Sequence, residues 1–315
     1  MSRFGILVVW AILIAVFGAL KPDTFLTLTN FQTLLSAQSL LLLLSLALIV
    51  SMTSGDFDFS LAGLLSINVV LIGQLHIVHE VPFLTTWLIV ILVSAVVGAL
   101  QALLIVGLNL SSFIVTLGSG TAFLGVAAAI DNNTRFGVDE NYAAFMSDKF
   151  LGIQSVFWIG IVVTLLLWYL YGYTPLGRQL FFVGANKDVA RLAGIHVTRL
   201  RIASLIGGSV LAGVASIATA GYLNSTDPAV GQNFLLPMVS AALLGTTCIW
   251  PGRPNPIGTL VAVYFLVTGY TGLLQLGLSG WVQQVFYGGA LVVAAAVATL
   301  AARRTGGGAP SFNPQ

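Results

Sequence analysis

Long apolar runs, separated by short polar stretches, recur along the whole chain. Each run is long enough to cross the hydrocarbon core of a bilayer, about 30 Å thick, as one α-helix. The pattern predicts about ten membrane-spanning helices. Their approximate bounds are 4–20, 36–52, 60–78, 86–108, 111–130, 153–172, 202–221, 236–250, 256–275 and 282–301. We therefore expect an all-α fold, a polytopic transmembrane helix bundle over residues 1–301 with a flexible tail at 302–315.

The composition agrees with a lipid-embedded protein. Of the 315 residues, 57% are hydrophobic and only 7% are charged, whereas a soluble domain carries about 25% charged residues. Lipid must therefore surround most of the surface. The net charge of +2 gives no reason to expect nucleic acid as a partner. Cys248 is the single cysteine, which excludes a disulfide framework and a cysteine-based metal site.

The charged loops predict the orientation. Segment 173–201 holds five basic residues and one acidic residue, so it should be cytoplasmic. Loop 131–150 holds four acidic and two basic residues and suits the outside. With ten helices, both termini lie in the cytoplasm. The same arrangement places four further arginines inside: Arg3, Arg253, Arg303 and Arg304.

One part of the cytoplasmic segment, residues 184–195, has the features of a short helix. Asn186 is a good N-cap, and Asp188 lies in the first turn, where the helix dipole favours a negative charge. Gly194 is a natural helix stop. The apolar residues Val189, Leu192 and Ala193 share one face. Such a helix suits docking into a groove on a soluble partner, and an ordinary basic loop is the alternative.

A second polar segment, residues 54–60, interrupts the apolar pattern with two aspartates. Asp56 and Asp58 at the centre of a helix would cost about 5–7 kcal/mol, so they must lie in a loop, in a water-filled cavity or in ion pairs. Gly55 and Ser60 indicate a break followed by a new helix, capped by Ser60 or Asp58. A capped turn and a place on a solute path both remain open.

These segments resemble the permeases of bacterial sugar ABC importers of the ribose and galactoside type. Residues 184–195 resemble the coupling region Gly-x-Asn-x-x-Ala-Ala-x-x-x-Gly-Ile of that family, which contacts the ATPase subunits. The matching positions are Gly184, Asn186, Ala190, Gly194 and Ile195. The resemblance implies a set of ATPase-coupling residues: Gly184, Asn186, Lys187, Val189, Ala190, Arg191, Leu192 and Gly194.

Other strings follow in the order of the same family over roughly residues 30–300. Residues 54–60 resemble Ser-Gly-Gly-Ile-Asp-Leu-Ser, with Asp56 in place of a glycine, and residues 112–118 resemble Pro-Phe-Ile-Val-Thr-Leu-Gly. Prolines at 251, 254 and 256 depart from a glycine-rich turn of the family. Permeases for branched-chain amino acids share parts of the coupling region, but the match at Asp58 and Ser60 favours the sugar branch.

The resemblance also implies residues along a translocation path. The candidates are Asp58, Ser60, Asn68, Phe113 and Thr116. Phe113 and Thr116 are three residues apart and would share a helix face, where an aromatic ring stacks on a sugar and a hydroxyl pairs with sugar hydroxyls. Packing in the protein core is the alternative for both residues.

Several chemistries have no support in the sequence. The chain has no Gly-x-x-x-x-Gly-Lys-Ser/Thr loop, so ATP should bind to a separate subunit and no cofactor to this chain. It has no His-Glu-x-x-His or Gly-x-Ser-x-Gly string, so we do not expect an enzyme. His76 and His79 are spaced for one helix face, but they lie where an apolar run ends and suit polar interfacial positions better than a metal site.

Taken with the resemblance, the sequence predicts the permease subunit of an ATP-binding-cassette importer in the bacterial inner membrane. It would move a sugar or a similar small polar solute. The implied partners are an ABC ATPase subunit, a second permease that is identical or paralogous, a periplasmic solute-binding protein and membrane lipid. The alternative is an ion-coupled secondary transporter or channel with Asp56 or Asp58 as its proton or sodium site.

Overall fold

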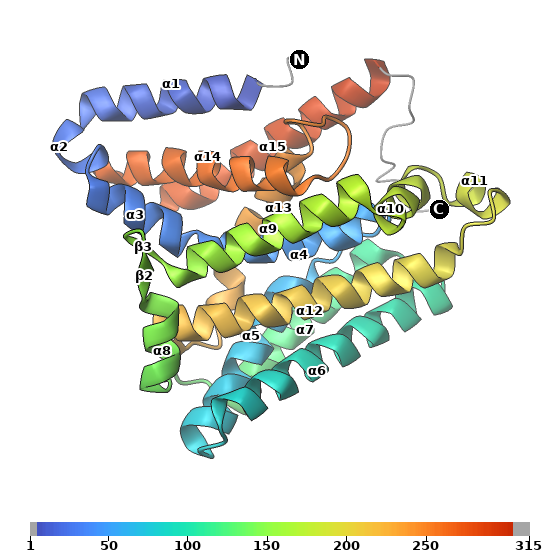
Figure 1. Cartoon of the computed structure of the whole chain (residues 1–315), viewed down its shortest axis with the longest axis horizontal. Helices are drawn as coiled ribbons and strands as arrows, with labels where there is room; N and C mark the ends of the chain where they lie inside the picture. Colours follow the sequence, from blue (N-terminus) through green and yellow to red (C-terminus); the bar gives the residue numbers. More distant parts are fainter. Residues whose placement is uncertain (1–4, 305–315) are drawn as a thin grey trace.

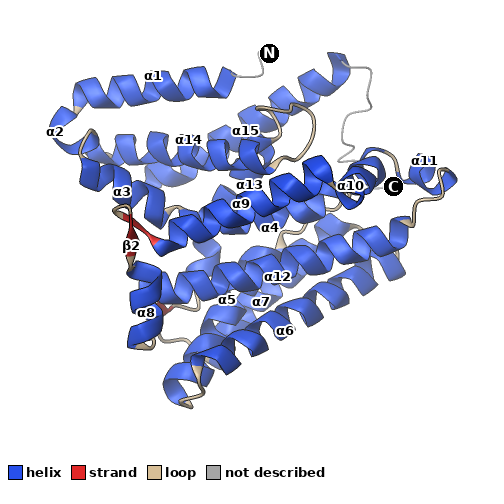
Figure 2. Ribbon diagram, viewed as in Figure 1, coloured by secondary structure: helices blue, strands red, loops and turns tan. Residues whose placement is uncertain are grey.

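Helices make up most of the part of the chain that the structure, a computed structural model, describes, residues 5–304 (Figures 1 and 2). Of the predicted tail at 302–315, only the first three residues are described, and they continue the last helix. The longer helices are α1 Gly5–Leu20, α3 Leu28–Ala37, α4 Ser39–Thr53, α5 Ser60–Ile72, α6 Phe83–Ala102, α7 Ser112–Ile130, α9 Ser155–Tyr173, α10 Pro175–Ala185, α12 Val197–Leu223, α13 Leu235–Gly245, α14 Pro256–Gln275 and α15 Trp281–Arg304.

Short elements connect these helices. The helical connectors are α2 Pro22–Phe25, α8 Glu140–Ser147, α11 Lys187–Leu192, the π-helical turns Gly73–Val78 and Leu103–Gly107, and the 3-10 turn Val230–Asn233. Two antiparallel pairs of two-residue strands complete the fold, β1 Arg135–Phe136 with β4 Ser225–Thr226 and β2 Lys149–Phe150 with β3 Ile153–Gln154.

Seven helical segments within the described residues are long and apolar enough to cross a membrane. They are Leu28–Thr53, Ser60–Val78, Phe83–Gly107, Ser112–Ile130, Ser155–Tyr173, Val197–Leu223 and Pro256–Gln275. Three shorter apolar helices accompany them, Gly5–Leu20, Val230–Gly245 and Trp281–Ala296. The predicted all-α, polytopic bundle is confirmed. The run predicted at 236–250 ends at Gly245, because the chain then turns as far as Asn255, whose side chain accepts a hydrogen bond from Gly258 N and caps α14.

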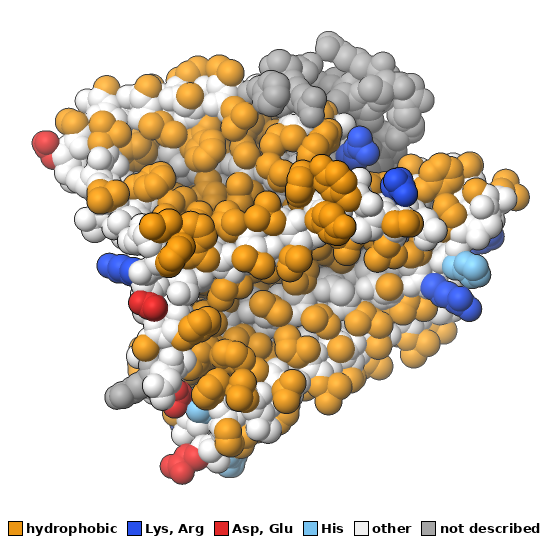
Figure 3. All heavy atoms as spheres, viewed as in Figure 1, with side chains coloured by type: hydrophobic (Ala, Val, Ile, Leu, Met, Phe, Trp, Pro, Cys, Tyr) orange, Lys and Arg blue, Asp and Glu red, His pale blue; other side chains and the backbone are white. Residues whose placement is uncertain are grey.

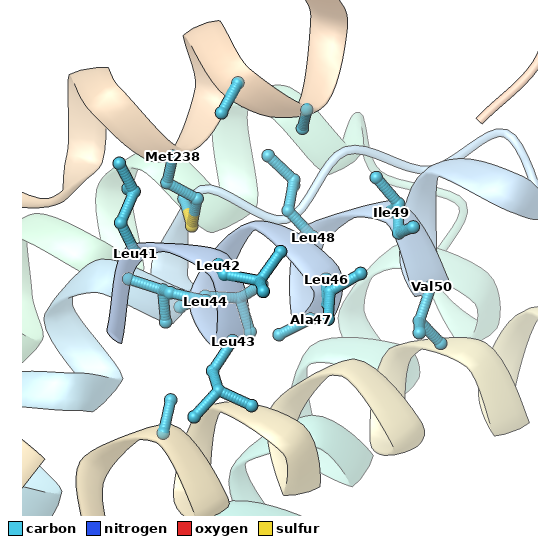
Figure 4. Packing of buried hydrophobic residues seen from close by; sticks show 14 of the residues in the cluster. Leu41, Leu42, Leu43, Leu44, Leu46, Ala47, Leu48, Ile49, Val50 and Met238 are labelled. Atoms are coloured by element: carbon cyan, nitrogen blue, oxygen red, sulfur yellow. The ribbon is translucent and has the colours of Figure 1, made fainter. Parts of the chain in front are cut away.

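Helix α4 lies at the centre of the bundle, and every one of its residues is buried. Its leucines pack against α12 on one side and against Met238 of α13 on another (Figure 4). A helix that is apolar all round requires such a central position or a lipid surrounding. Beside it, Gly63 of α5 lies against the carbonyl of Gly120 of α7 so closely that any side chain there would collide. Such contacts between small residues let membrane helices pack tightly.

The charges divide the bundle into two ends. Lysine and arginine side chains gather beside α10 and α11, whereas aspartates and glutamates gather mainly at the opposite end, near α2 and α8 (Figures 1 and 3). We call the first the basic end and the second the acidic end. Turn 54–59 between α4 and α5 lies at the basic end, since Asp56 contacts Lys187 at the start of α11.

Candidate functional site

Helix α11 forms where the sequence predicts a short helix, with narrower bounds. Gly184 and Ala185 belong to the preceding helix α10, and Asn186 separates the two with an extended backbone. The Asn186 side chain accepts hydrogen bonds from the backbone N–H groups of Asp188 and Val189, both at 3.0 Å. Downstream of α11, Gly194 adopts a φ of +78° in the left-handed region. The predicted cap and stop are therefore both present.

The apolar face of α11 points away from the chain that carries it. Leu192 is 89% exposed and Val189 is 49% exposed, whereas Ala190 is buried. The helix protrudes at the basic end of the bundle (Figure 1). The opposite face of α11 is anchored to the bundle, because Ala190 packs into the main hydrophobic core. Two exposed apolar side chains on a supported, capped helix leave a surface that a partner protein can cover.

Asp56 connects turn 54–59 with the segment that carries α11. Its carboxylate is almost fully buried and accepts two hydrogen bonds from the guanidinium of Arg201, both at 2.7 Å. Lys187 at the start of α11 lies 3.5 Å from the same carboxylate. This bidentate geometry is the strong form of an arginine–carboxylate pair. It also gives Asp56 a specific structural partner.

Close backbone packing reinforces this connection. The Cα of Gly184 lies against the Thr53 carbonyl, and a side chain at Gly184 would collide with it. Gly55 adopts a φ of +85° and faces Gly184 from the other chain segment. The hydroxyls of Ser54 and Ser204 are 2.6 Å apart. We call this joint the clasp; it consists of Ser54, Gly55 and Asp56 on one side and Gly184, Lys187, Arg201 and Ser204 on the other.

Asp58 lies two residues before the start of helix α5 at Ser60. Its Oδ1 accepts hydrogen bonds from the backbone N–H of Ser60 at 3.0 Å and from the Ser60 hydroxyl at 2.5 Å. The side chain is fully buried, and Oδ2 has no hydrogen-bond partner within the described residues. Burial raises the pKa of this carboxyl, which lies between two candidate spans, to about 6. Asp58 thus accepts hydrogen bonds from the first residue of α5, whereas the N-cap position is Phe59, which forms no side-chain cap hydrogen bond.

Four of the five predicted path residues are buried within the chain. Asp58, Ser60 and Thr116 are buried, and the Thr116 hydroxyl donates to the carbonyls of Ser112 and Phe57. Asn68 is buried as well, and it donates to the hydroxyls of Ser94 and Ser216, which joins α5 to α6 and α12. Four of the five candidates therefore lie in the interior of the bundle, where they form hydrogen bonds with backbone and side-chain groups.

Phe113 differs from the other four candidates. It is 49% exposed and packs edge to face on Phe59, with ring centroids 5.5 Å apart. Phe59 in turn stacks on Phe57 at 6.0 Å. These three rings line a cavity of about 350 Å³ together with side chains of α13 and α15. Phe113 therefore borders a cavity, whereas Thr116 is buried within the chain.

His76, for which the sequence predicts a polar interfacial position, connects two backbone segments in the structure. Its Nδ1 lies 2.7 Å from the Val81 carbonyl, and its Nε2 lies 3.3 Å from the Asp139 backbone N–H. Both ring nitrogens therefore face backbone groups at the acidic end. No group of three potential metal ligands occurs among the residues that the structure describes.

Sequence reasoning did not find the partnership of Asp56 with Arg201. The two residues are 145 positions apart, and no local pattern joins them. A signal was present, because Asp56 is a charged residue inside a nearly apolar stretch, and a buried charge requires a counter-charge.

Comparison with known proteins identifies the family. The family described as the permease component of branched-chain amino acid transport systems matches residues 30–295. The chain belongs to this permease family. It is therefore a multi-pass membrane transport subunit and not an enzyme.

Individual relatives match between 76% and 93% of this permease. A probable ABC transporter permease protein of Escherichia coli K12 is 31% identical over 293 residues, 93% of this chain and 88% of that protein. The D-allose transport system permease protein of the same organism is 26% identical over 292 residues, 92% of this chain and 90% of that protein. The ribose import permease protein of Bacillus subtilis 168 is 29% identical over 243 residues, 76% and 75% of the two chains. No solved structure matches this permease.

Proposed function

We propose that this permease moves a sugar or a similar small polar solute across the bacterial inner membrane as part of an ABC importer. The observation that carries the proposal is helix α11, whose exposed apolar face is joined through the clasp to the break between α4 and α5. Relatives named for D-allose and ribose support a sugar as the solute class. The buried, ion-paired state of Asp56 disfavours an ion-coupled carrier that would use this carboxylate.

The proposed topology has ten crossings with both termini in the cytoplasm. Seven long spans and three shorter apolar helices supply the ten segments. An even number brings both termini to one side, and the excess of lysine and arginine at the basic end favours the cytoplasm. The acidic end would then face the periplasm, where a solute-binding protein would deliver the solute.

In this orientation, α11 would dock into a groove of the ATPase subunit. Leu192 and Val189 would fill the groove, while Asn186 and Gly194 fix the two ends of the helix and Arg191 lies at its rim. ATP would bind to that partner subunit. Gly184 and Lys187 would act on the membrane side of the same segment, through their contacts in the clasp.

The clasp would carry movement from α11 into the membrane. Turn 54–59 is the place where the central helix pair α4–α5 is interrupted. Its first residues are bonded locally, as shown by Gly55 donating to the Met52 carbonyl at 3.0 Å, whereas the Phe57 N–H donates to the Ser112 hydroxyl of α7. A turn with short local bonds bends more readily than a continuous helix. A displaced α11 would thus reposition the start of α5 through Asp56.

The solute path would run between two permease chains, identical or paralogous. Asp58, Ser60, Asn68 and Thr116 are buried inside one chain, so they would shape the wall of the path and not touch the solute in this state. Phe113 is the predicted path residue that a solute reaches from outside the chain. Its ring would stack on a sugar face when two chains enclose the path.

A charge on the exposed face of α11 tests the proposal. Leu192→Glu, in a complex reconstituted with ATPase and solute-binding protein, should abolish both solute-stimulated ATP hydrolysis and uptake of D-ribose, D-allose or L-arabinose. Leu192→Met, the matched control, should retain both, because methionine fills an apolar groove equally well. Leu192 makes few contacts within its own chain, so thermal unfolding should stay unchanged in both variants. Wild-type stimulation by Leu192→Glu would contradict docking through α11.

A further inference from the structure

A large cleft at the basic end is not used by the proposed coupling or permeation. It has a volume of about 800 Å³ and lies between the end of α9, helix α10 and turn 246–255, which precedes α14. Its lining includes Arg178, Arg253, Trp168, Trp250, Phe182 and Asn255. We call it the basic cleft.

The basic cleft combines unpaired positive charge with aromatic walls. Within the described part of the chain, no carboxylate lies within 4.0 Å of the guanidinium of Arg178 or Arg253. Arg253 instead lies over the Phe181 ring, 5.5 Å from its centroid. Both arginines are exposed. Two guanidiniums without a counter-charge on one cleft attract an anion.

The dipole of α14 adds to this positive potential. Asn255 and Pro256 line the cleft at the first turn of this 20-residue helix. The N-terminus of a helix carries about half a positive charge. The anion-attracting character of the cleft thus has two independent sources, the arginine side chains and the helix end.

The deeper walls of the cleft require an apolar ligand body. Trp168 belongs to the candidate span Ser155–Tyr173, whereas Arg178 lies beyond the end of that span. The cleft therefore extends from the level of the hydrocarbon to the level of the headgroups. Tryptophan and tyrosine are the residues typical of that boundary. A soluble protein surface has no apolar extension that would enter the span region, whereas a lipid has both parts.

We propose that the basic cleft binds an anionic phospholipid, with its phosphate between Arg178 and Arg253 and an acyl chain along Trp168 and Phe182. Basic pockets between transmembrane helices are suited to such headgroups. The proposal does not depend on which solute the permease moves. It depends on the proposed orientation only for the leaflet, which would be the cytoplasmic one.

Tryptophan quenching by brominated lipid tests the proposal, since Trp168 and Trp250 both line the cleft. The full-length permease is reconstituted into phosphatidylcholine vesicles that contain a minor share of either dibrominated phosphatidylglycerol or dibrominated phosphatidylcholine. We expect stronger quenching by the phosphatidylglycerol. The excess quenching should vanish in Trp168→Phe/Trp250→Phe. Equal quenching by both lipids, or an excess that persists in the double variant, would overturn the proposal.

Charge variants measure the contribution of each arginine. Arg178→Gln and Arg253→Gln should each weaken the preference for phosphatidylglycerol roughly fivefold, which corresponds to the typical effect of one basic residue near an anionic membrane surface. Arg199→Gln is the matched control, because Arg199 is exposed on α12 and does not line the cleft. A preference that falls equally in Arg199→Gln would reflect the general charge of the basic end and would contradict a site.

Two additions separate lipid from other occupants. Added inorganic phosphate should leave the preference for phosphatidylglycerol unchanged. If phosphate abolishes the preference, the cleft binds a soluble phosphate compound and the lipid assignment is wrong. The assembled complex with the ATPase subunit should show the same preference as the permease alone. Its loss there would make the cleft part of the protein interface and overturn the lipid assignment. Failure of any of these tests leaves the effect of Leu192→Glu untouched, so the two proposals fail separately.

Discussion

The clasp makes a quantitative prediction for Asp56. Asp56→Asn keeps the size of the side chain but removes its charge, which leaves Arg201 without a counter-charge although its side chain is only 12% exposed. Removing one partner of a buried ion pair costs about 3–5 kcal/mol. We expect the lower value, about 3 kcal/mol, because the Arg201 side chain keeps some exposure to solvent. Lys187 should contribute less than about 1 kcal/mol, since it is 38% exposed and 3.5 Å away.

The permease carries its own probe for this measurement. Cys248 is the single cysteine and is 1% exposed, so a thiol-reactive dye reports unfolding as the side chain becomes accessible. At about 2 °C per kcal/mol for a chain of this size, Asp56→Asn should lower Tm by about 6 °C. Lys187→Met, the matched control, should lower it by about 2 °C or less.

A double variant separates stability from coupling. Asp56→Asn/Arg201→Gln removes both charges, so no buried charge is left unpaired and most of the lost stability should return. Solute-stimulated ATP hydrolysis should remain low in the assembled complex, because the ionic tie between α12 and turn 54–59 is still missing and only the Ser54–Ser204 hydroxyl contact remains. A decrease in Tm that is no larger for Asp56→Asn than for Lys187→Met would refute the clasp as described.

Two further substitutions test neighbouring features. Gly184→Ala should destabilise the permease by about 1–3 kcal/mol in the same dye assay, because the new methyl group collides with the Thr53 carbonyl, whereas Gly172→Ala, with open space around it, should be neutral or slightly stabilising. Asp58→Asn removes a carboxyl whose pKa is raised from 3.8 to about 6, so the folded state binds more protons than the unfolded state between these values and wild-type stability falls as pH rises through this window. The variant should therefore lose this pH dependence, which amounts to at most about 3 kcal/mol in the free energy of unfolding. At pH 7.5 it should be at least as stable as wild type. A lower Tm of the variant at that pH would show that the ionised carboxylate is needed.

Local chemistry was predictable from the sequence, and so were most of the spans. The cap at Asn186 and the stop at Gly194 could be predicted, because the cap bonds and the left-handed turn involve only residues that are close in sequence. Hydropathy located the apolar runs because a helix that crosses the hydrocarbon core of a bilayer must be apolar over the thickness of that core.

Burial could not be predicted in the same way. The candidate spans Leu28–Thr53 and Ser112–Ile130 are both strongly apolar. Yet 72% of the most apolar stretch of the first span is buried, and only 17% of that of the second. Lipid and protein interior are equally apolar, so hydropathy does not separate a central helix from a peripheral one. For the same reason hydropathy did not show how Phe113 and Thr116 differ in burial: the threonine bonds to backbone carbonyls inside the bundle, and the phenylalanine borders a cavity.

The position of the clasp follows from the weakness of α11 as an isolated element. A six-residue helix cannot transmit force by its own stability, since isolated helices of this length do not persist in water. It must be tied to elements that continue into the membrane. Lys187, the first residue of α11, and Arg201, which follows on α12, both contact one carboxylate at the break in the central helix pair. A relative with glycine in place of Asp56 would lack this electrostatic tie and would depend on backbone packing alone, so this permease should lose more coupling than such a relative when ionic contacts are weakened.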